Sequence, residues 1–247
     1  MIYEKAELIK KTKLKENVFS IILNCKEIEK KATPGQFANI LIEGFTLRRP
    51  FSICEIEKDQ INIVFNVKGK GTKKMASWQE GKSVNIIAPL GKGFAPLKKE
   101  EKILLVGGGI GLAPLLCLCK KEHNITTLAG FNSREDIILK EEFKKFGDFL
   151  ICTKDGSLGE KGFVTDYVKK YVKKYGITRI ASCGPNQMLE KVLKIAKEGK
   201  IFCEISLEER MACGIGACLC CQHILNENSN KKIVHVCKDG PVFKFSP

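Results

Sequence analysis

The sequence lacks long hydrophobic runs. Nowhere in its 247 residues do about 18 uncharged apolar residues follow one another, which is the length that a membrane-spanning helix needs. Residues 1–20 carry charges but no apolar segment after them, so they do not resemble a secretory signal peptide. These absences argue against a membrane or secreted protein and predict a cytoplasmic one.

A concentrated basic and aromatic patch is lacking as well. The chain has 42 Lys and Arg against 28 Asp and Glu, a net charge of +14, but only 8% of its residues are aromatic. The lysines are spread in pairs along predicted helix faces, for example at 144–145, 169–170 and 173–174. This pattern indicates solvated surfaces and argues against a nucleic-acid partner, while it is compatible with attraction for anionic dinucleotides.

Cysteine, in contrast, is abundant. A chain of this length buries a core without cross-links, and a reducing compartment disfavours disulfides, so twelve cysteines indicate core residues or metal ligands. Several of them crowd into MACGIGACLCC, residues 211–221, and one more follows in HVCKDGPVF. Four have the spacing C-x4-C-x2-C-x15-C, which is typical of plant-type [2Fe-2S] ligands. The predicted metal ligands are Cys213, Cys218, Cys221 and Cys237.

Other interpretations of this loop explain less. Structural zinc usually takes two CxxC-like knuckles, and core cysteines would not be expected among glycines without hydrophobic periodicity. Redox-active thiols at Cys220 and Cys221 would leave Cys213 and Cys237 unexplained. A loop around two irons needs sharp turns and close backbone approach, which Gly214 and Gly216 allow. Cys220 is left over and is expected to point away from the cluster.

The hydrophobic pattern divides the chain into three parts. Residues 1–97 contain short alternating runs separated by turn residues, and predict a small antiparallel β-barrel or sandwich with a helix over 71–79. The predicted strands are 4–14, 18–25, 35–42, 49–56, 60–67 and 83–91.

Residues 98–202 change to alternating strands and amphipathic helices, which predicts βαβ units and a doubly wound parallel sheet. Residues 203–247 form a small appended module that begins with a strand over 201–207. The predicted strands of the second part are 102–109, 125–132, 149–157 and 179–185, and its predicted helices are 110–122, 133–147, 162–176 and 186–200.

Two stretches suggest nucleotide sites, each weakly on its own. Gly107, Gly108, Gly109 and Gly111 lie between a predicted strand and a helix, where a pyrophosphate can bind a helix N-terminus; an ordinary glycine-rich turn is the alternative. In the first part, RPFS at 49–52 offers an arginine and a hydroxyl, although it could be only a barrel strand with a basic edge. VFNVKGKGT ends at a probable helix start, where free N–H groups could receive a phosphate.

In combination these motifs resemble a known superfamily. RPFS, GKGT, GGGIGLAPL and CGP are similar to the ferredoxin-NADP reductase superfamily, which pairs a flavin-binding barrel with a nicotinamide-binding domain. The cysteine module is more specific, and with it essentially the whole chain resembles the electron-transfer subunits of dihydroorotate dehydrogenase B. The resemblance implies FAD at the barrel, with contacts from Arg49, Pro50, Phe51, Ser52, Val64, Phe65, Asn66, Gly71 and Thr72, and NAD(H) at Gly107, Gly108, Gly109, Gly111, Cys183, Gly184 and Pro185.

Two positions depart from the family pattern. Relatives often have arginine where this chain has Asn66, so one phosphate contact is in question, and Lys68 or Lys70 could substitute. Relatives often carry glycine at Cys220, while the four ligand positions are intact.

The resemblance also implies a function and a partner. In this family NADH delivers a hydride to FAD, and single electrons pass through the [2Fe-2S] cluster to or from FMN in a separate catalytic subunit that oxidises dihydroorotate for pyrimidine (UMP) synthesis. Two copies of each chain form a heterotetramer. Positioning is then the protein's task, so no catalytic side chain is assigned, and His123, His223 and His235 are expected to be structural.

Alternative functions come from two classes. One is the flavin and iron-sulfur subunit of an NADPH-ferredoxin transhydrogenase or a sulfide dehydrogenase complex; the other is a non-enzymatic iron-sulfur redox sensor, for which no signalling element is evident. The choice between NADH and NADPH is open from the residues, because Ser133 and Arg134 could bind a 2′-phosphate while Glu135 and Asp136 could take a ribose hydroxyl. Arg134 could equally be a solvated helix residue. The resemblance favours NADH.

Overall fold

The computed structural model describes residues 1–119, 123–227 and 230–247. By packing, the chain forms two units, which are described separately. Unit 1 comprises Met1–Gly93 and Leu207–Val242, and unit 2 comprises Phe94–Ser206 and Phe243–Pro247. No helix among the described residues is long and apolar enough to cross a membrane.

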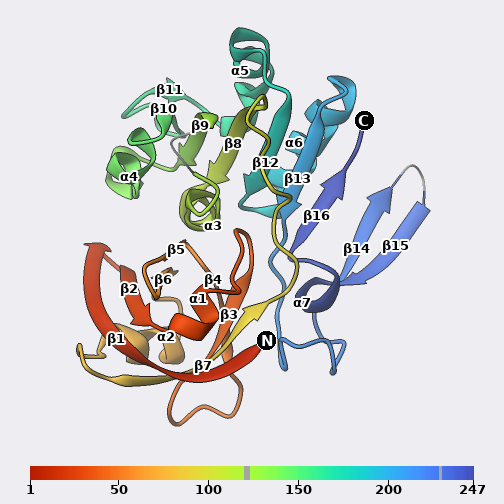
Figure 1. The fold of residues 1–247 in the computed structure, drawn as a ribbon. Helices are drawn as coiled ribbons and strands as arrows, with labels where there is room; N and C mark the ends of the chain where they lie inside the picture. Colours follow the sequence, from red (N-terminus) through yellow and green to blue (C-terminus); the bar gives the residue numbers. More distant parts are fainter. Residues whose placement is uncertain (120–122, 228–229) are drawn as a thin grey trace. The chain divides into compact units, whose positions relative to one another are not determined.

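Unit 1 is built on one antiparallel seven-stranded sheet, in the order β4-β3-β7-β1-β2-β6-β5 (Figure 1). Alternation along the strands points one side chain in two into a common core, as in β2, where Ile21 and Leu23 are buried in the core and Ile22 between them is half-buried. Its elements are β1 (Ile2–Lys15), β2 (Val18–Asn24), α1 (Lys26–Glu29), β3 (Phe37–Leu41), β4 (Arg49–Ser52), β5 (Glu55–Glu57), β6 (Gln60–Asn66), α2 (Lys70–Ala76) and β7 (Ser83–Leu90).

The sheet curls so that strands far apart in this order meet. Phe51 on β4 packs edge-on against Phe65 on β6, with ring centroids 5.9 Å apart. The run 49–56, predicted as one strand, is in fact two: β4 pairs with β3, and after Ile53 and Cys54 the chain pairs with β6 as β5. Because of this break, residues 49–57 supply both edge strands of the curled sheet, β4 at one edge and β5 at the other.

The C-terminal part of unit 1 adds a loop, a hairpin and a short helix. The hairpin, β14 (Gln222–Glu227) and β15 (Asn230–His235), forms its own two-stranded sheet, and α7 (Val236–Asp239) follows it. The chain then returns to the barrel at the end of β7, where the Lys92 N–H donates to the Gly240 carbonyl at 2.5 Å.

Unit 2 contains the predicted parallel sheet. Its strand order is β11-β10-β9-β8-β12-β13-β16, so the chain winds outward from β8 in one direction and then crosses to β12 on the other side (Figure 1). Its strands are β8 (Lys102–Gly108), β9 (Asn124–Phe131), β10 (Gly147–Thr153), β11 (Glu160–Lys161), β12 (Arg179–Cys183), β13 (Phe202–Ser206) and β16 (Val242–Phe245). Its helices are η1 (Gly109–Leu112), α3 (Ala113–Leu116), η2 (Arg134–Asp136), α4 (Lys140–Lys144), η3 (Val164–Asp166), α5 (Val168–Tyr175) and α6 (Asn186–Glu198).

All four helices predicted for unit 2 are shorter than the sequence pattern predicts, and two of them differ most. The segment 133–147 is not one helix: Ile137 is extended and Leu139 has a positive φ of 58°, which separates η2 from α4. Ile138 and Leu139 are buried in this extended connection, so their apolar character reflects packing and not a helical face. Over 110–122 the α-helix ends at Leu116, and residues 120–122 lie outside the described part of the chain.

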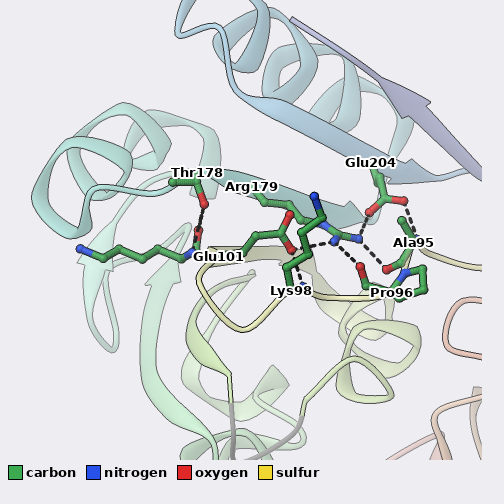
Figure 2. A network of polar contacts seen from close by, with 8 residues as sticks. Ala95, Pro96, Lys98, Glu101, Thr178, Arg179 and Glu204 are labelled. Atoms are coloured by element: carbon green, nitrogen blue, oxygen red, sulfur yellow. Dashed lines mark hydrogen bonds and ion pairs between the residues drawn. The ribbon is translucent and has the colours of Figure 1, made fainter.

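A buried ionic network holds the start of unit 2 onto its sheet (Figure 2). The guanidinium of Arg179 on β12 is 1% exposed and pairs with the carboxylate of Glu204 on β13, which is fully buried. Its Nη1 also contacts the Glu101 carboxylate at 3.0 Å, and its Nη2 donates to the Ala95 carbonyl at 2.7 Å. Glu204 in turn accepts the Ala95 N–H at 2.8 Å. Two strands and the segment before β8 are thereby fixed by one side chain.

Candidate iron-sulfur and nucleotide sites

The predicted iron-sulfur ligands come together as two pairs in unit 1. The backbone N–H of Cys218 lies 3.4 Å from the Cys213 Sγ, and their thiols are within hydrogen-bonding reach. Likewise the Cys237 N–H donates to the Cys221 Sγ at 3.3 Å, and these two thiols also contact each other. Two thiolates for each of two irons is the ligand set of a [2Fe-2S] cluster.

Backbone N–H groups surround the first of these sulfurs. Burial raises the pKa of the Cys213 thiol, but hydrogen bonds from the Ile215 and Cys218 N–H groups outweigh it and lower the pKa to about 6. Burial, and then the neighbouring Cys221 thiol, raise the pKa of Cys237 to about 12. The thiolate is the form that binds metal. The loop therefore favours the metal-binding form of Cys213, whereas Cys237 would lose its proton only when a bound cation stabilised its thiolate.

Two glycines allow the loop its path. Gly214 has φ +70°, and a Cβ there would lie 2.5 Å from the Asn39 Nδ2. Gly216 has φ +86°, and a Cβ there would lie 3.1 Å from the Lys238 side chain. Both positions therefore combine a left-handed backbone with close approach of a neighbour.

The pairing of the four cysteines is compatible with a two-iron cluster. Within the described ranges, no group of three or more His, Cys, Asp or Glu side chains is gathered where it could hold one metal ion. Paired thiols with N–H groups aimed at sulfur fit a cluster in which each iron takes two cysteines. Cys220 is exposed, as is the predicted ligand Cys218, so exposure does not separate the two, and the exclusion of Cys220 stays a prediction from the spacing.

The loop lies against strand β3 of the barrel. The Asn39 Nδ2 donates to the Cys213 carbonyl at 2.9 Å, and the Phe37 ring lies on the same side of the strand, near Gly214. Sequence analysis missed both residues. The signal was present in FANIL, which is buried at four of its five positions: Ala38 and Ile40 enter the barrel core, while Phe37 and Asn39 are covered on the other face.

The residues predicted to bind flavin gather from three elements of unit 1. Arg49, Pro50, Phe51 and Ser52 form β4; Val64, Phe65 and Asn66 end β6; Gly71 and Thr72 begin α2. Besides the contact between Phe51 and Phe65, a Cβ on Gly71 would lie 3.6 Å from the Arg49 Nε, so the arginine and the helix start are neighbours.

The start of α2 is shaped by Thr72. Its Oγ1 accepts the N–H groups of Lys68 at 2.9 Å and Gly69 at 3.1 Å.

Arg48, the residue before the predicted flavin strand, has a structural role, because its guanidinium binds the Asn85 Oδ1 at 2.6 Å. Burial lowers the pKa of this guanidinium.

The residues predicted to bind nicotinamide nucleotide also gather, in unit 2. Gly107 and Gly108 end β8, and Cys183 ends β12, opposite Gly107 in the strand register. Gly109 has φ +55° and starts η1. These strand ends lie where the sheet reverses its winding direction, which is where ligands bind in open α/β sheets.

Close backbone packing explains the glycines of this site. A Cβ on Gly111 would lie 2.5 Å from the Cys183 carbonyl oxygen, and a Cβ on Gly108 would lie 2.9 Å from the Pro185 ring. A Cβ on Gly184, which has φ +155°, would lie 3.1 Å from the Gly108 N. Close packing of the strand ends therefore leaves no room for a side chain at Gly108, Gly111 or Gly184.

Two of the histidines have local partners. The His223 Nδ1 lies 2.8 Å from the Glu209 carboxylate, and the His235 Nδ1 lies 3.8 Å from the Asp239 carboxylate, which also accepts the backbone N–H of His235 at 2.8 Å. The Nδ1 of His123 is buried without a hydrogen-bond partner among the described residues. Contacts of this kind agree with the structural role expected for His223 and His235.

Comparison with known proteins identifies the family. Residues 208–246 match the family model described as the iron-sulfur cluster binding domain of dihydroorotate dehydrogenase B. The chain is 38% identical to the dihydroorotate dehydrogenase B (NAD(+)) electron transfer subunit of Caldanaerobacter subterraneus subsp. tengcongensis, over 97% of this chain and 95% of the relative. The chain belongs to this family.

A second electron transfer subunit of dihydroorotate dehydrogenase B, from Fusobacterium nucleatum, is 42% identical over 87% of this chain and 86% of its own length. The resemblance predicted from the motifs is therefore confirmed, as is the assignment to an oxidoreductase that transfers electrons.

Solved structures confirm the predicted fold class. An NADH-dependent reduced ferredoxin-NADP oxidoreductase matches with a TM-score of 0.86 at 29% identity, over 98% of this chain and 88% of that one. A ferredoxin NADP+ reductase from Neisseria gonorrhoeae matches with a TM-score of 0.67 at 15% identity, over 79% and 91% of the two chains, and shows the fold alone. The NADH-dependent reduced ferredoxin-NADP oxidoreductase corresponds to the transhydrogenase alternative. Its sequence is less similar to this chain, at 29% identity, than the sequences of the two dihydroorotate dehydrogenase B subunits, at 38% and 42%.

Proposed function

We propose that the chain carries electrons between NADH and a catalytic subunit that interconverts dihydroorotate and orotate in pyrimidine synthesis. Its cofactors are FAD, a [2Fe-2S] cluster and NAD(H). When bound, the flavin exchanges a two-electron hydride for single electrons and the cluster carries one electron at a time. One observation carries the proposal: the loop with the two cysteine pairs lies against β3, the strand paired with β4, within one packed unit.

The protein's own task is to bind and orient. We infer that Arg49 and the start of α2 hold the anionic part of FAD, and that the half-buried Phe51 ring, which packs on the buried Phe65 ring, offers an apolar surface. We infer that the turn after β8, together with Gly184 and its neighbours, holds the nicotinamide nucleotide. We infer NADH and not NADPH because the most similar relatives carry NAD(+) in their names.

The domain limits predicted from the sequence stay part of the proposal. We assign residues 1–97 to FAD binding, 98–202 to NAD binding and 203–247 to the cluster. The packing of Leu207–Val242 with the barrel supports a cluster module that works with the flavin domain.

An electron transfer subunit implies a catalytic partner, and the cluster module has the surface for one. Residues 207–242 contain four basic and four acidic residues, so the charged side chains of this segment balance within a chain of net charge +14, and a [2Fe-2S] cluster on four thiolates would add negative charge. Four apolar side chains of the segment are about half exposed, and low charge with exposed apolar groups is typical of permanent subunit contacts. They are Ile215 (47%), Leu219 (54%), Ile224 (50%) and Ile233 (58%).

The hairpin presents two of these side chains together. Ile224 on β14 lies directly opposite Ile233 on β15, while Leu225 and Val234 are buried on the other face. We infer that the partner is the FMN-containing catalytic subunit, in a heterotetramer of two copies of each chain. We infer the cytoplasm as the location, because a loop of thiols that binds iron needs a reducing compartment.

Reconstitution tests this function. We expect the purified chain to reduce an artificial electron acceptor with NADH but to leave orotate unchanged. Addition of the catalytic subunit should give NADH-dependent conversion of orotate to dihydroorotate. Orotate conversion by the isolated chain would contradict the subunit assignment, and strict dependence on NADPH would favour the transhydrogenase alternative.

A further inference from the structure

Asn39 is a buried polar residue whose place in the barrel is unexplained by the fold. Its side chain is on β3 and the residue is 1% exposed. The Nδ2 donates to the Cys213 carbonyl at 2.9 Å, and the Oδ1 is buried with no hydrogen-bond partner among the described residues. Half of this amide is therefore used by the cluster loop, residues 211–221, and the other half is unsatisfied.

The energetics of burial argue that the barrel itself does not need this amide. An unsatisfied buried polar atom destabilises the folded state, and an apolar side chain of similar shape would avoid that penalty. The loop is fitted to the amide instead, because Gly214 leaves room where any Cβ would lie 2.5 Å from the Nδ2. The contact with Cys213 therefore explains the asparagine better than barrel folding does.

The strand register places this contact beside the proposed flavin strand. Asn39 is directly opposite Pro50 on β4, and Phe37 is directly opposite Ser52. Side chains of residues opposed in this way share one face of a sheet. The two residues that meet the cluster loop thus share a face with Pro50 and Ser52.

We propose that Asn39 is a positioning residue for electron transfer. Its amide holds Cys213 against β3, and so fixes one end of the cluster loop relative to the flavin strand. This inference rests on the proposed function, because it assumes a cluster at the four cysteines and a flavin at β4. Loss of one hydrogen bond of this kind should lower the equilibrium constant between the docked and the undocked loop by roughly fivefold.

The test compares three variants of the complete, cofactor-loaded protein. Asn39→Leu removes the donor and the orphan oxygen together, while Asn39→Asp keeps the shape and replaces the donor by an acceptor. Asn62→Leu is the matched control, since the Asn62 amide bonds Ser20 and Glu55 within the barrel sheet. For each we would measure the rate of iron loss to a chelator, the electron paramagnetic resonance spectrum of the reduced cluster, the flavin content and the melting temperature.

We expect both Asn39 variants to lose iron roughly fivefold faster than the wild type and to show an altered cluster spectrum. Flavin content should be unchanged, and Asn39→Leu should melt no lower than the wild type. The control should keep the wild-type spectrum and rate of iron loss.

Two results would overturn the inference. One is a wild-type rate of iron loss and a wild-type spectrum in both Asn39 variants. The other is loss of flavin together with the cluster, or failure to fold, in both, because Asn39 would then hold the barrel and not the loop. A wild-type protein that bound no cluster would instead refute the proposed function.

Discussion

Replacement of Arg179 should destabilise unit 2 far more than the loss of an ordinary ion pair. In Arg179→Met the carboxylate of Glu204, which is fully buried, loses its counter-charge, and the carbonyl of Ala95 loses a donor. Breaking a buried pair from one side costs about 3–5 kcal/mol, because the remaining charge stays buried. The Ala95 N–H is too weak a partner to make up this loss.

Hydrogen exchange measures this effect where it arises. Amides of β12 and β13 should exchange through opening of unit 2, and a loss of about 3–5 kcal/mol speeds such exchange by roughly 10² to several 10³-fold. The experiment compares peptides from these strands with peptides from β1 and β2 of unit 1 in the same sample. We expect the acceleration in unit 2.

A matched control separates burial from charge. Lys170→Met removes an ion pair with Glu160 whose two side chains are 54% and 35% exposed. Exposed pairs contribute about 0–1 kcal/mol, so exchange should change by less than about fivefold. Equal effects of the two substitutions, or an Arg179→Met protein with wild-type exchange in β12, would refute the reasoning.

Three further predictions concern the sites. Cys218→Ser should abolish the cluster while Cys220→Ser retains it, as measured by iron and sulfide content; loss of the cluster in both would contradict the ligand assignment. Gly111→Ala should weaken NADH binding with FAD retained, because its Cβ would lie 2.5 Å from the Cys183 carbonyl oxygen, and wild-type affinity in calorimetry would count against the site. Ile224→Lys should weaken association with the catalytic subunit in ultracentrifugation, because Ile224 is half exposed opposite Ile233, and unchanged association would remove the hairpin from the interface.

Local patterns were enough to predict most of the architecture. Alternation of apolar residues identified the strands of the half-barrel, and the strand-helix rhythm identified the parallel sheet, because both patterns follow from the periodicity of buried faces. The cysteine spacing predicted four ligands, three in the loop and Cys237 beyond the hairpin, and their binding of iron stays a prediction. Those features depend on neighbours in sequence.

The contacts that join distant segments could not be predicted in this way. Asn39 and Cys213 are far apart in the chain, and nothing in FANIL indicates which segment covers its second face. Arg179 and Glu204 similarly look like two ordinary charged residues until the strands are placed side by side. The helix predicted over 133–147 was wrong because burial of an extended segment gives an apolar pattern that resembles a helical one.

The most direct test of the account is an anaerobic titration of the purified chain with NADH, followed by visible spectroscopy and by assay of flavin, iron and sulfide. We predict one FAD and about two irons and two sulfides per chain, with flavin and cluster absorption both bleached by NADH. Zinc without flavin, or a cluster that NADH does not reduce, would contradict the path from NADH through the barrel to the cysteine loop.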